Sequence, residues 1–440
     1  MSSVAPILPI YYDSQRKEYL RRNPNGRWQG FGIREITERL VSHGLSLNPV
    51  SKDNPLNECH MMRQRITDEN DVVYSGSLAG HNEGFYEKNG IRYLVTDSPT
   101  LIDPLKGDWH TILPLLLNMF GEKQCTVFLS WLKIAAESLR SGNWTQQQAL
   151  AIAGEVACGK SFVQNYIITP CLGGRSAKAA RYMLGKTQFN SDLFESEHLV
   201  MDDEFVSHKI ADRLALGASI KKMTVSTESE SLHGKGRKAV PMSPFWRLTF
   251  TLNDNPEALQ VLPILNEDIA DKIIILKASK HDFLMPTNTL EQKGLFLSAI
   301  RSELPAFLYH LLNDFRIPDD MVDSRYGVAS YQNPEIIEAL DEIAPETTLL
   351  RLIDSLLQNK ETKIEAIELR DRLYNNPETS FEAKRLLDGW DGKTALYLGR
   401  LAKKHPERFI CPTNNKNRKW VIKPDNKKEE DGLTEILNAM

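Results

Sequence analysis

The sequence has 440 residues and a mass of 50.0 kDa, which is enough for two to three domains with sizeable cores. Apolar residues make up 41% and charged residues 25% of the chain, a composition typical of soluble globular proteins that excludes general disorder. The net charge of -4 excludes a protein that coats nucleic acid over its whole surface, so any such binding must be local. The five cysteines form neither a CxxC pair nor a zinc-spaced cluster, and no apolar run is long enough to span a membrane. We therefore expect a cytoplasmic protein with no membrane segment and no disulfide framework.

The first 145 residues predict two parts ahead of the main domain. Residues 1–107 are expected to form an N-terminal accessory region, in which a helical pattern stops at Gly44 and short β-like runs follow. Residues 108–145 carry apolar residues at helical spacing, with an interruption near Gly121. This second part is expected to be a helical collar for assembly or, alternatively, an ordinary piece of the core.

Residues 146–335 predict the main domain. Strand-like runs (LAIAG, HLVM, FWRLTFTLN and DKIIILKA) alternate here with helical segments, and a longer helical pattern containing Pro305 follows them. Alternation of strands and helices is typical of an α/β fold with a mostly parallel sheet. Such a sheet binds its ligands at the carboxyl ends of its strands.

Residues 346–424 contain three helical patterns followed by FICPTNNKNRKWVI, two β-like arms around an Asn-rich turn, and residues 425–440 are expected to be a loose tail. This order predicts a winged-helix-like domain. Eight lysines and arginines lie between Arg400 and Lys423, against the single acid Glu407. A helix in the major groove with a basic wing on the backbone would bind duplex DNA, through Lys403, Lys404, Arg418 and Lys419. Winged helices also serve as protein-contact modules, and that alternative stays open.

The segment GEVACGKS, from Gly154 to Ser161, contains each residue type that a phosphate-binding P-loop needs. Glycines let backbone amides approach phosphate, Lys160 brings charge to the β- and γ-phosphates, and Ser161 supplies a hydroxyl for Mg²⁺. A strand-like run precedes the segment and a helical run follows it, which disfavours a chance match. We predict that ATP and Mg²⁺ bind here, through Gly154, Glu155, Val156, Ala157, Cys158, Gly159, Lys160, Ser161 and Phe162.

Two further runs place polar residues at predicted strand ends. HLVMDDE ends in carboxylates that can hold Mg²⁺ and polarise water, so Asp203 is assigned to the metal and Glu204 to the base, with Asp202 as an alternative ligand or structural partner. An acidic strand end alone is more often only solvated, but its place about 40 residues after a P-loop favours catalysis. RLTFTLNDNP ends in Asn253, which would orient the attacking water or, alternatively, mark a turn.

Between these two runs lies a basic, Gly-punctuated segment that predicts a hairpin. Lysines and arginines on such a hairpin would contact DNA backbone phosphates without reading sequence, although a basic loop is usually only a solvated surface. The candidate DNA-binding residues in this segment are Lys221, Lys222, Lys235, Arg237 and Lys238.

The order and spacing of GEVACGKS, LVMDDE, the basic segment and FTLNDNP resemble superfamily 3 helicases, especially the primase-helicase proteins of phages, plasmids and large DNA viruses. The resemblance covers about residues 146–280. It implies an AAA+-like core, a hexameric ring with ATP at subunit interfaces, and single-stranded DNA drawn through the pore by basic hairpins. Forked DNA and a separate primase or replication initiator are then the expected partners, since the first 110 residues show no convincing acidic triad for a primase.

One departure from this family concerns the arginine finger. The stretch ILNEDIADKIIILKA, where the family carries it, has Lys272 and no arginine. Lysine supplies a point charge but not the bidentate contact of arginine, so Lys272 either acts in trans as the finger or is a surface residue. Two functions are therefore carried forward: an ATP-dependent DNA helicase in replication of a phage or other mobile element, and a regulatory or defence NTPase that uses nucleotide as a switch.

Overall fold

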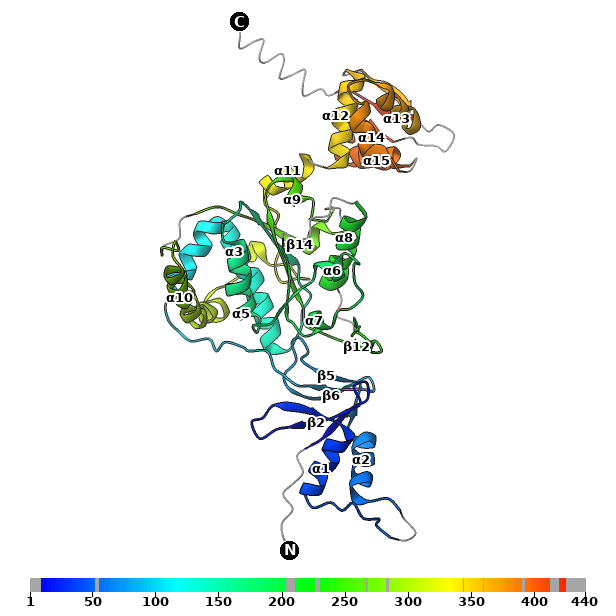
Figure 1. Cartoon of the computed structure of the whole chain (residues 1–440). Helices are drawn as coiled ribbons and strands as arrows, with labels where there is room; N and C mark the ends of the chain where they lie inside the picture. Colours follow the sequence, from blue (N-terminus) through cyan, green and yellow to red (C-terminus); the bar gives the residue numbers. More distant parts are fainter. Residues whose placement is uncertain are drawn as a thin grey trace. The chain divides into compact units, whose positions relative to one another are not determined.

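The computed structural model of the chain describes residues 9–51, 55–202, 210–225, 230–263, 265, 268–281, 285–342, 344–358, 360–389, 392–411 and 419–424. The chain divides into two compact units, Met1–Asn333 and Pro334–Met440 (Figure 1). The first unit contains the accessory region and the main domain, and the second contains the basic C-terminal segment.

The accessory region begins with a four-stranded sheet and two helices. The sheet has the order β3-β2-β1-β4 and consists of β1 (Tyr11–Asp13), β2 (Glu18–Arg22), β3 (Trp28–Phe31) and β4 (Asp71–Val72). A small apolar core that includes Ile36 and Cys59 joins it to α1 (Ile33–Ser42) and α2 (Glu58–Glu69). The helix expected before Gly44 is thus confirmed.

A second small sheet connects this region to the main domain. It has the order β5-β7-β6, formed by β5 (Tyr74–Gly76), β6 (Gly84–Lys88) and β7 (Ile91–Val95). One buried cluster joins Tyr74 and Tyr93 of this sheet to Leu232 and Met242 of the antiparallel hairpin β11 (Glu230–Leu232) and β12 (Val240–Met242). The second sheet and the hairpin therefore share a core.

The main domain is organised around a five-stranded sheet in which every pair of neighbouring strands is parallel. Its order is β14-β8-β13-β10-β9, with β8 (Ala149–Gly154), β9 (Ser176–Lys178), β10 (His198–Met201), β13 (Arg247–Asn253) and β14 (Ile273–Ala278). The four strand-like runs of the sequence form β8, β10, β13 and β14, as predicted. Nearly all of their side chains are buried, because helices cover both faces.

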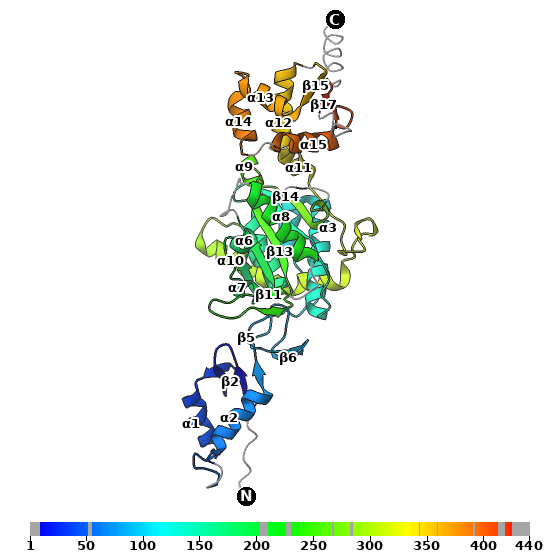
Figure 2. The same ribbon diagram turned by 90° about the vertical axis from the view of Figure 1, so that its right-hand side faces the viewer.

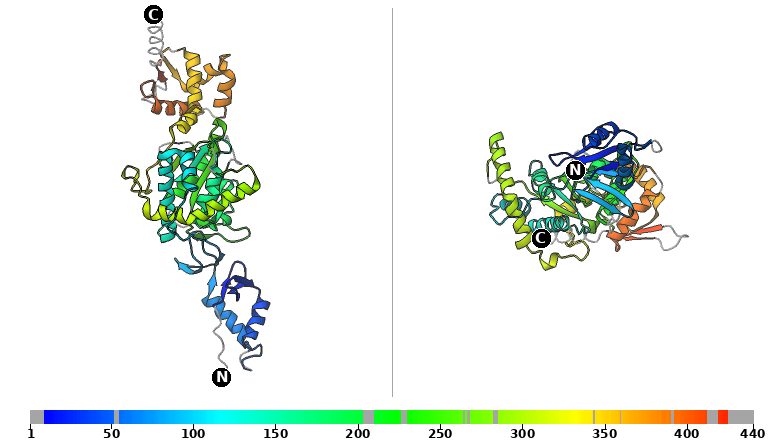
Figure 3. Two further views of the ribbon diagram at one scale, coloured as in Figure 1. Left: turned by 90° about the vertical axis from the view of Figure 1, so that its left-hand side faces the viewer. Right: turned by 90° about the horizontal axis from the view of Figure 1, so that it is seen from below.

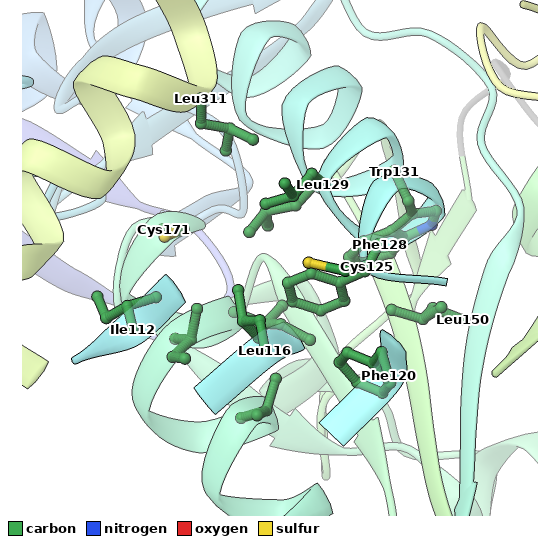
Figure 4. Close-up of a cluster of buried hydrophobic side chains, with 14 of the residues drawn as sticks. Ile112, Leu116, Phe120, Cys125, Phe128, Leu129, Trp131, Leu150, Cys171 and Leu311 are labelled. Carbon is green, nitrogen blue, oxygen red and sulfur yellow. The ribbon is translucent and has the colours of Figure 1, made fainter. Parts of the chain in front are cut away.

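One face of the sheet is covered by a single large hydrophobic core (Figure 4). Phe128 and Trp131 of the long helix α3 pack there near Leu150 of β8, Cys171 and Leu311. The elements on this face are α3 (Ile112–Ser141), α4 (Lys160–Val163), a π-helical turn (Gln164–Ile168), α5 (Thr169–Cys171), α10 (Leu290–Tyr309) and a second π-helical turn (His310–Asp314).

The segment expected to be a helical collar corresponds to α3. Its helix is interrupted at Gly121, where the backbone has φ 68° and ψ 167°, as the sequence pattern indicated. Burial against the sheet and α10 accounts for its apolar residues. A role in assembly stays a prediction.

The other face of the sheet carries shorter helices. Figure 1 shows α6 and α8 on the side away from α3 and α10. The side that carries α6 and α8 faces the viewer in Figure 2, and the opposite side faces the viewer in the left view of Figure 3. The elements of this part are α6 (Ala180–Met183), α7 (Ser191–Phe194), α8 (Ile210–Val225), α9 (Pro256–Leu259) and a 3₁₀ turn (Ala270–Lys272). A further 3₁₀ turn follows α10 at Asp319–Met321.

The second unit combines five helices with a small antiparallel sheet among its described residues. The helices are α11 (Pro334–Glu342), α12 (Pro345–Leu357), α13 (Ala366–Asn375), α14 (Ser380–Leu387) and α15 (Lys393–Lys404). The sheet has the order β15-β17-β16, with β15 (Thr362–Glu365), β16 (Phe409–Ile410) and β17 (Lys419–Ile422). The two arms predicted around the Asn-rich turn are β16 and β17, while β15 was not anticipated.

Candidate functional site

The GEVACGKS turn connects β8, which lies between β14 and β13 in the sheet, to the amino end of α4, as the sequence predicted. Two of its residues have left-handed backbone conformations, Ala157 with φ 63° and Gly159 with φ 98°. These conformations let consecutive backbone amides of the turn face inward, which is the arrangement that binds phosphate. Among the residues of the turn, Val156 is 70% exposed and Cys158 is buried.

Gly154 is required by the neighbouring strand. A Cβ placed on it would collide with the carbonyl oxygen of Ala278 at the end of β14 and would lie 3.0 Å from the Cβ of that residue. β8 and β14 therefore approach each other more closely than any larger residue at this position allows. The glycine predicted for phosphate also has a packing role.

Lys160 is held at the centre of the turn, with only 6% of its surface exposed. Its Nζ donates to the carbonyl oxygens of Gly154 at 2.8 Å and Glu155 at 2.7 Å. A third donor contact reaches Oδ1 of Asn253 at 3.3 Å. The ammonium group is thus positioned by the turn at the place where a phosphate oxygen would take over one or more of these contacts.

Asn253 reaches the turn because β13 lies next to β8, with Asn253 and Gly154 as direct partners in the parallel register. The sequence separates the two residues by about 100 positions, so only the strand order brings them together. The structure therefore unites Lys160 and Asn253, two of the residues predicted to be catalytic.

The acidic run after β10 is only partly described. Asp202 lies at the carboxyl end of that strand, and its carboxylate forms an ion pair with Lys178 of β9 at 3.0 Å. This contact agrees with the alternative in which Asp202 is a structural partner. Asp203 and Glu204, assigned to the metal and to the base, lie outside the described residues, so both assignments stay predictions.

The remaining residues of the predicted nucleotide site are Ser161 and Phe162, which lie on the first turn of α4. Ser161 is exposed, as a hydroxyl that is to reach Mg²⁺ must be. The ring of Phe162 instead stacks on Phe296 of α10, with 5.1 Å between centroids. Its side chain therefore anchors α4 to α10, which leaves its backbone amide as the group available to phosphate.

A buried polar network lies below this site, between the P-loop helix and the sheet. Nδ1 and Nε2 of His198 lie 2.7 Å and 2.8 Å from the hydroxyls of Thr169 and Thr249, and Gln164 donates to the same Thr249 hydroxyl at 2.8 Å. Burial lowers the pKa of His198 to about 3, so the ring is neutral at neutral pH. The network ties the helix after the P-loop to β10 and β13, and no sequence motif indicated it.

The basic segment forms the predicted hairpin, β11 and β12. Lys235, Arg237 and Lys238 are exposed at its tip, and none of the three forms an ion pair with another residue that the structure describes. Lys221 and Lys222 lie on α8 instead, where they pair with Asp268 and Glu230.

The sequence analysis missed Asn190, which anchors the hairpin. This fully buried side chain donates to the carbonyl of Ser231 at 3.0 Å and accepts from the amide of His233 at 2.7 Å. The two bonds fix the first strand of the hairpin to the start of α7. An Asn in an unremarkable polar run gives no sequence signal for such a role.

Lys272, proposed as a finger, lies at the amino end of β14, whereas the P-loop lies at the carboxyl end of the neighbouring β8. It therefore cannot reach the P-loop of its own chain. Only 6% of its surface is exposed and its Nζ bonds Asp271 at 2.6 Å, so it is not the surface residue that was the alternative. Arg325, which the sequence analysis did not single out, lies against the same Asp271 at 3.4 Å and is exposed.

The basic residues of the C-terminal unit are divided between free and paired groups. Lys404 pairs with Asp341 at 2.7 Å, Arg400 pairs with Glu346 at 3.4 Å, and Arg408 pairs with Asp354. Lys403 and Lys419 are exposed without a described ion pair. Arg418 lies outside the described residues.

The fold and the site together define an α/β protein with a P-loop-type turn after β8, an interior strand of a parallel sheet. Among solved structures, the chain is similar to the apo structure of the NrS-1 C-terminal region (305–718), with a TM-score of 0.53 and 13% identity over 94% of this chain and 96% of that one. A second structure of that region, its A form, gives 0.51 and 14% over the same shares. These similarities define a fold shared over nearly the whole chain.

A structure described as SCCmec type IV Cch, an active helicase, aligns with a TM-score of only 0.30 and 11% identity over 91% of this chain and 74% of that one. No protein-family model and no curated protein matches the sequence. Within the described residues, no helix is long and apolar enough to cross a bilayer.

Proposed function

We propose that the protein is an ATP-dependent DNA helicase or translocase of the superfamily 3 type, which works as a hexameric ring in replication of a phage or other mobile element. The observation that carries the proposal is the contact of Lys160 with both the P-loop carbonyls and Asn253 of the adjacent strand. A P-loop lysine linked to a polar strand end is the arrangement that positions a γ-phosphate and an attacking water.

Each residue of the site has a distinct task in this proposal. Lys160 neutralises charge that develops on the transferred phosphate, and Asn253 orients the water. Ser161 and Asp203 would hold Mg²⁺, which neutralises charge on the β- and γ-phosphates, and Glu204 would accept the proton of the water. Asp202 keeps Lys178 and the end of β9 in place.

The cation that completes the site must come from a neighbouring subunit, because the amino end of β14 is far from the P-loop of its own chain. Asp271 lies between two candidates, Lys272 on one oxygen and Arg325 on the other. Arg325 is the better donor to a neighbour's phosphate, because it is exposed and its guanidinium makes bidentate contacts.

A trans role for Arg325 can be tested by mixing inactive subunits. Arg325→Ala and Lys160→Ala chains are each expected to lose ATPase activity by about 10³-fold. Co-assembly of the two should restore activity well above either alone, because some interfaces then combine an intact P-loop with an intact cation. Mixtures as inactive as their components would contradict the trans role, and Lys272→Ala in place of Arg325→Ala tests the other candidate.

DNA contact is assigned to the exposed cations of the hairpin tip and, in the second unit, to a winged-helix-like module with α15 as its groove helix. The helix and strand order of the second unit supports this assignment, since α15 leads directly into the two antiparallel arms β16 and β17. Lys403 and Lys419 are the contacts available there.

The decisive experiment measures ATP hydrolysis by the full chain with and without single-stranded DNA. Lys160→Ala is expected to abolish hydrolysis, by about 10³-fold or more, while Lys293→Ala on the exposed face of α10 serves as a matched lysine control. ATP hydrolysis that persists in Lys160→Ala, or that is not stimulated by single-stranded DNA in the unchanged chain, would contradict the proposal.

A second function, a regulatory or defence NTPase switch, is favoured by one observation. Asp271 neutralises both candidate trans cations, which suits a protein that binds nucleotide and hydrolyses it slowly. Size measurement in ATP combined with forked-DNA unwinding distinguishes the two functions: a monomer that hydrolyses ATP without DNA stimulation is the switch.

A further inference from the structure

A partly open, positively charged pocket lies at the amino edge of the parallel sheet, opposite the P-loop. Its volume is about 230 Å³, and its wall includes Lys88, Trp144, Phe245, Trp246 and Arg247. Arg247 is the first residue of β13 and Asn253 the last, so the pocket and the P-loop are separated by the length of that strand, roughly 20 Å.

Arg247 is the unusual feature of this pocket, because only 6% of the residue's surface is exposed. Its Nη atoms donate to the carbonyls of Trp246 at 2.8 Å and Thr145 at 3.1 Å, and its Nε has no acceptor. No carboxylate among the described residues forms an ion pair with it. Burial lowers the pKa of Arg247 to about 9, so the group remains charged at neutral pH. The guanidinium lies over the Phe245 ring, 4.2 Å from its centroid, which stabilises the cation but does not neutralise it. An anion bound beside this buried charge would therefore stabilise it further.

Other groups make this a prepared site for an anion. Lys88 lines the same pocket from β6, where its Nζ is 3.4 Å from the hydroxyl of Ser243. Nε1 of Trp144 is a second buried donor without an acceptor in the described structure. Glu230, the acidic residue of the wall, is occupied by its ion pair with Lys222.

The aromatic part of the wall is held firmly. The Trp144 ring lies edge-on to His81, with 4.8 Å between centroids, and to Phe245, at 6.2 Å. Gly80 packs so closely on Trp144 and Phe245 that a Cβ there would collide with both. A fixed indole beside two cations suits a planar base joined to a phosphate.

We propose that this pocket is a second nucleotide-binding site, which takes a single phosphate-bearing nucleotide unit through Lys88 and Arg247, with its base against Trp144. The pocket is too small for an oligonucleotide, so the ligand is either a free mononucleotide or the terminal nucleotide of a DNA strand. Both share the same chemistry of one phosphate and one base.

Binding to this site is measured in the Lys160→Ala full chain, so that the P-loop contributes little. The probes are dTMP, inorganic phosphate, thymidine, and a dT tetramer with either a 5′-phosphate or a 5′-hydroxyl. Equilibrium dialysis should find one dTMP per chain, bound with a dissociation constant below about 1 mM, and tighter than phosphate or thymidine. Saturation by dTMP identifies a free-nucleotide site, and binding of only the 5′-phosphorylated tetramer identifies a strand-end site.

Variants of the wall then test the assignment. Lys88→Glu is expected to weaken binding at least tenfold, and Trp144→Phe, which keeps a ring but removes the donor, about threefold. Lys293→Ala is the control and should change nothing. Lys88 is exposed, so its variant will fold even if changes at Arg247 do not. No saturable binding of any probe, binding unchanged by Lys88→Glu, or phosphate bound as tightly as dTMP would each overturn the proposal.

Discussion

The hairpin tip and the basic part of the C-terminal unit hold their positive charge in different ways. Lys235, Arg237 and Lys238 are exposed and have no ion pair among the described residues. In the second unit, acids from other helices pair with Arg400, Lys404 and Arg408, so much of the apparent charge is internal. Counting lysines and arginines along the sequence treats the two segments as equal. Only the cations without partners can replace counterions on DNA without first losing a stabilising contact.

The largest expected effect is on the hairpin. Replacing Lys235, Arg237 and Lys238 together by Ala should weaken binding of single-stranded DNA by about 10–100-fold and lower the salt slope by about 2, since about 0.7 is lost per phosphate contact. The comparison variant, Arg400→Ala with Lys404→Ala, should change DNA affinity less than twofold. Fluorescence anisotropy at several salt concentrations measures DNA affinity and its salt dependence. Equal losses of affinity in the two variants would contradict the difference between the two regions.

Lowering the pH should reduce the stability of the main domain without changing the charge of the hairpin cations. The pKa of His198 is lowered to about 3 in the folded chain, so the unfolded state takes up a proton that the folded state does not between pH 6.5 and about 3. Stability should therefore fall as the pH drops below about 6.5, by about 2 kcal/mol at pH 5, whereas the hairpin cations keep their charge. Urea unfolding from pH 7 to pH 5 measures how the free energy of unfolding changes with pH. His198→Gln should reduce the proton uptake on unfolding by about one proton and so make this pH dependence weaker. An unchanged slope in that variant would assign the pH dependence to other groups.

The smallest expected effect is on the paired cations of the second unit. Asp354→Asn removes the charge that faces Arg408, and because the pair is partly exposed the cost should be about 1 kcal/mol. A change of this size lowers the melting temperature of a small unit by about 4–8 °C and should leave DNA affinity unaltered. Glu38→Gln, in the exposed surface pair with Arg34, is the control and should cost less than about 0.5 kcal/mol. Tighter DNA binding by Asp354→Asn would show that the pair masks a DNA contact.

The sequence predicted the elements whose signal is local. The P-loop turn, four of the five parallel strands and the basic hairpin all form where hydrophobic runs and glycines indicated them. The link between Lys160 and Asn253 depends on strand order, which no local pattern specifies. Burial of Lys272, pairing of Asp202 and the role of Asn190 depend on residues that are distant in sequence. The short strand β15 was not predicted, because four residues are too few to show the alternation of apolar and polar residues that indicates a strand.

The close approach of Gly154 to Ala278 connects two parts of the molecule that are far apart. β14 begins next to Asp271 and Lys272 and ends at the P-loop, so this buried strand connects the two sites rigidly. Gly154→Ala would push the carboxyl end of β14 away from β8, because the added methyl group would collide with Ala278. Since packed interiors transmit small displacements and do not absorb them, the residue that fits the phosphate turn also sets the position of Asp271 and Lys272, the edge that we propose faces a neighbouring subunit.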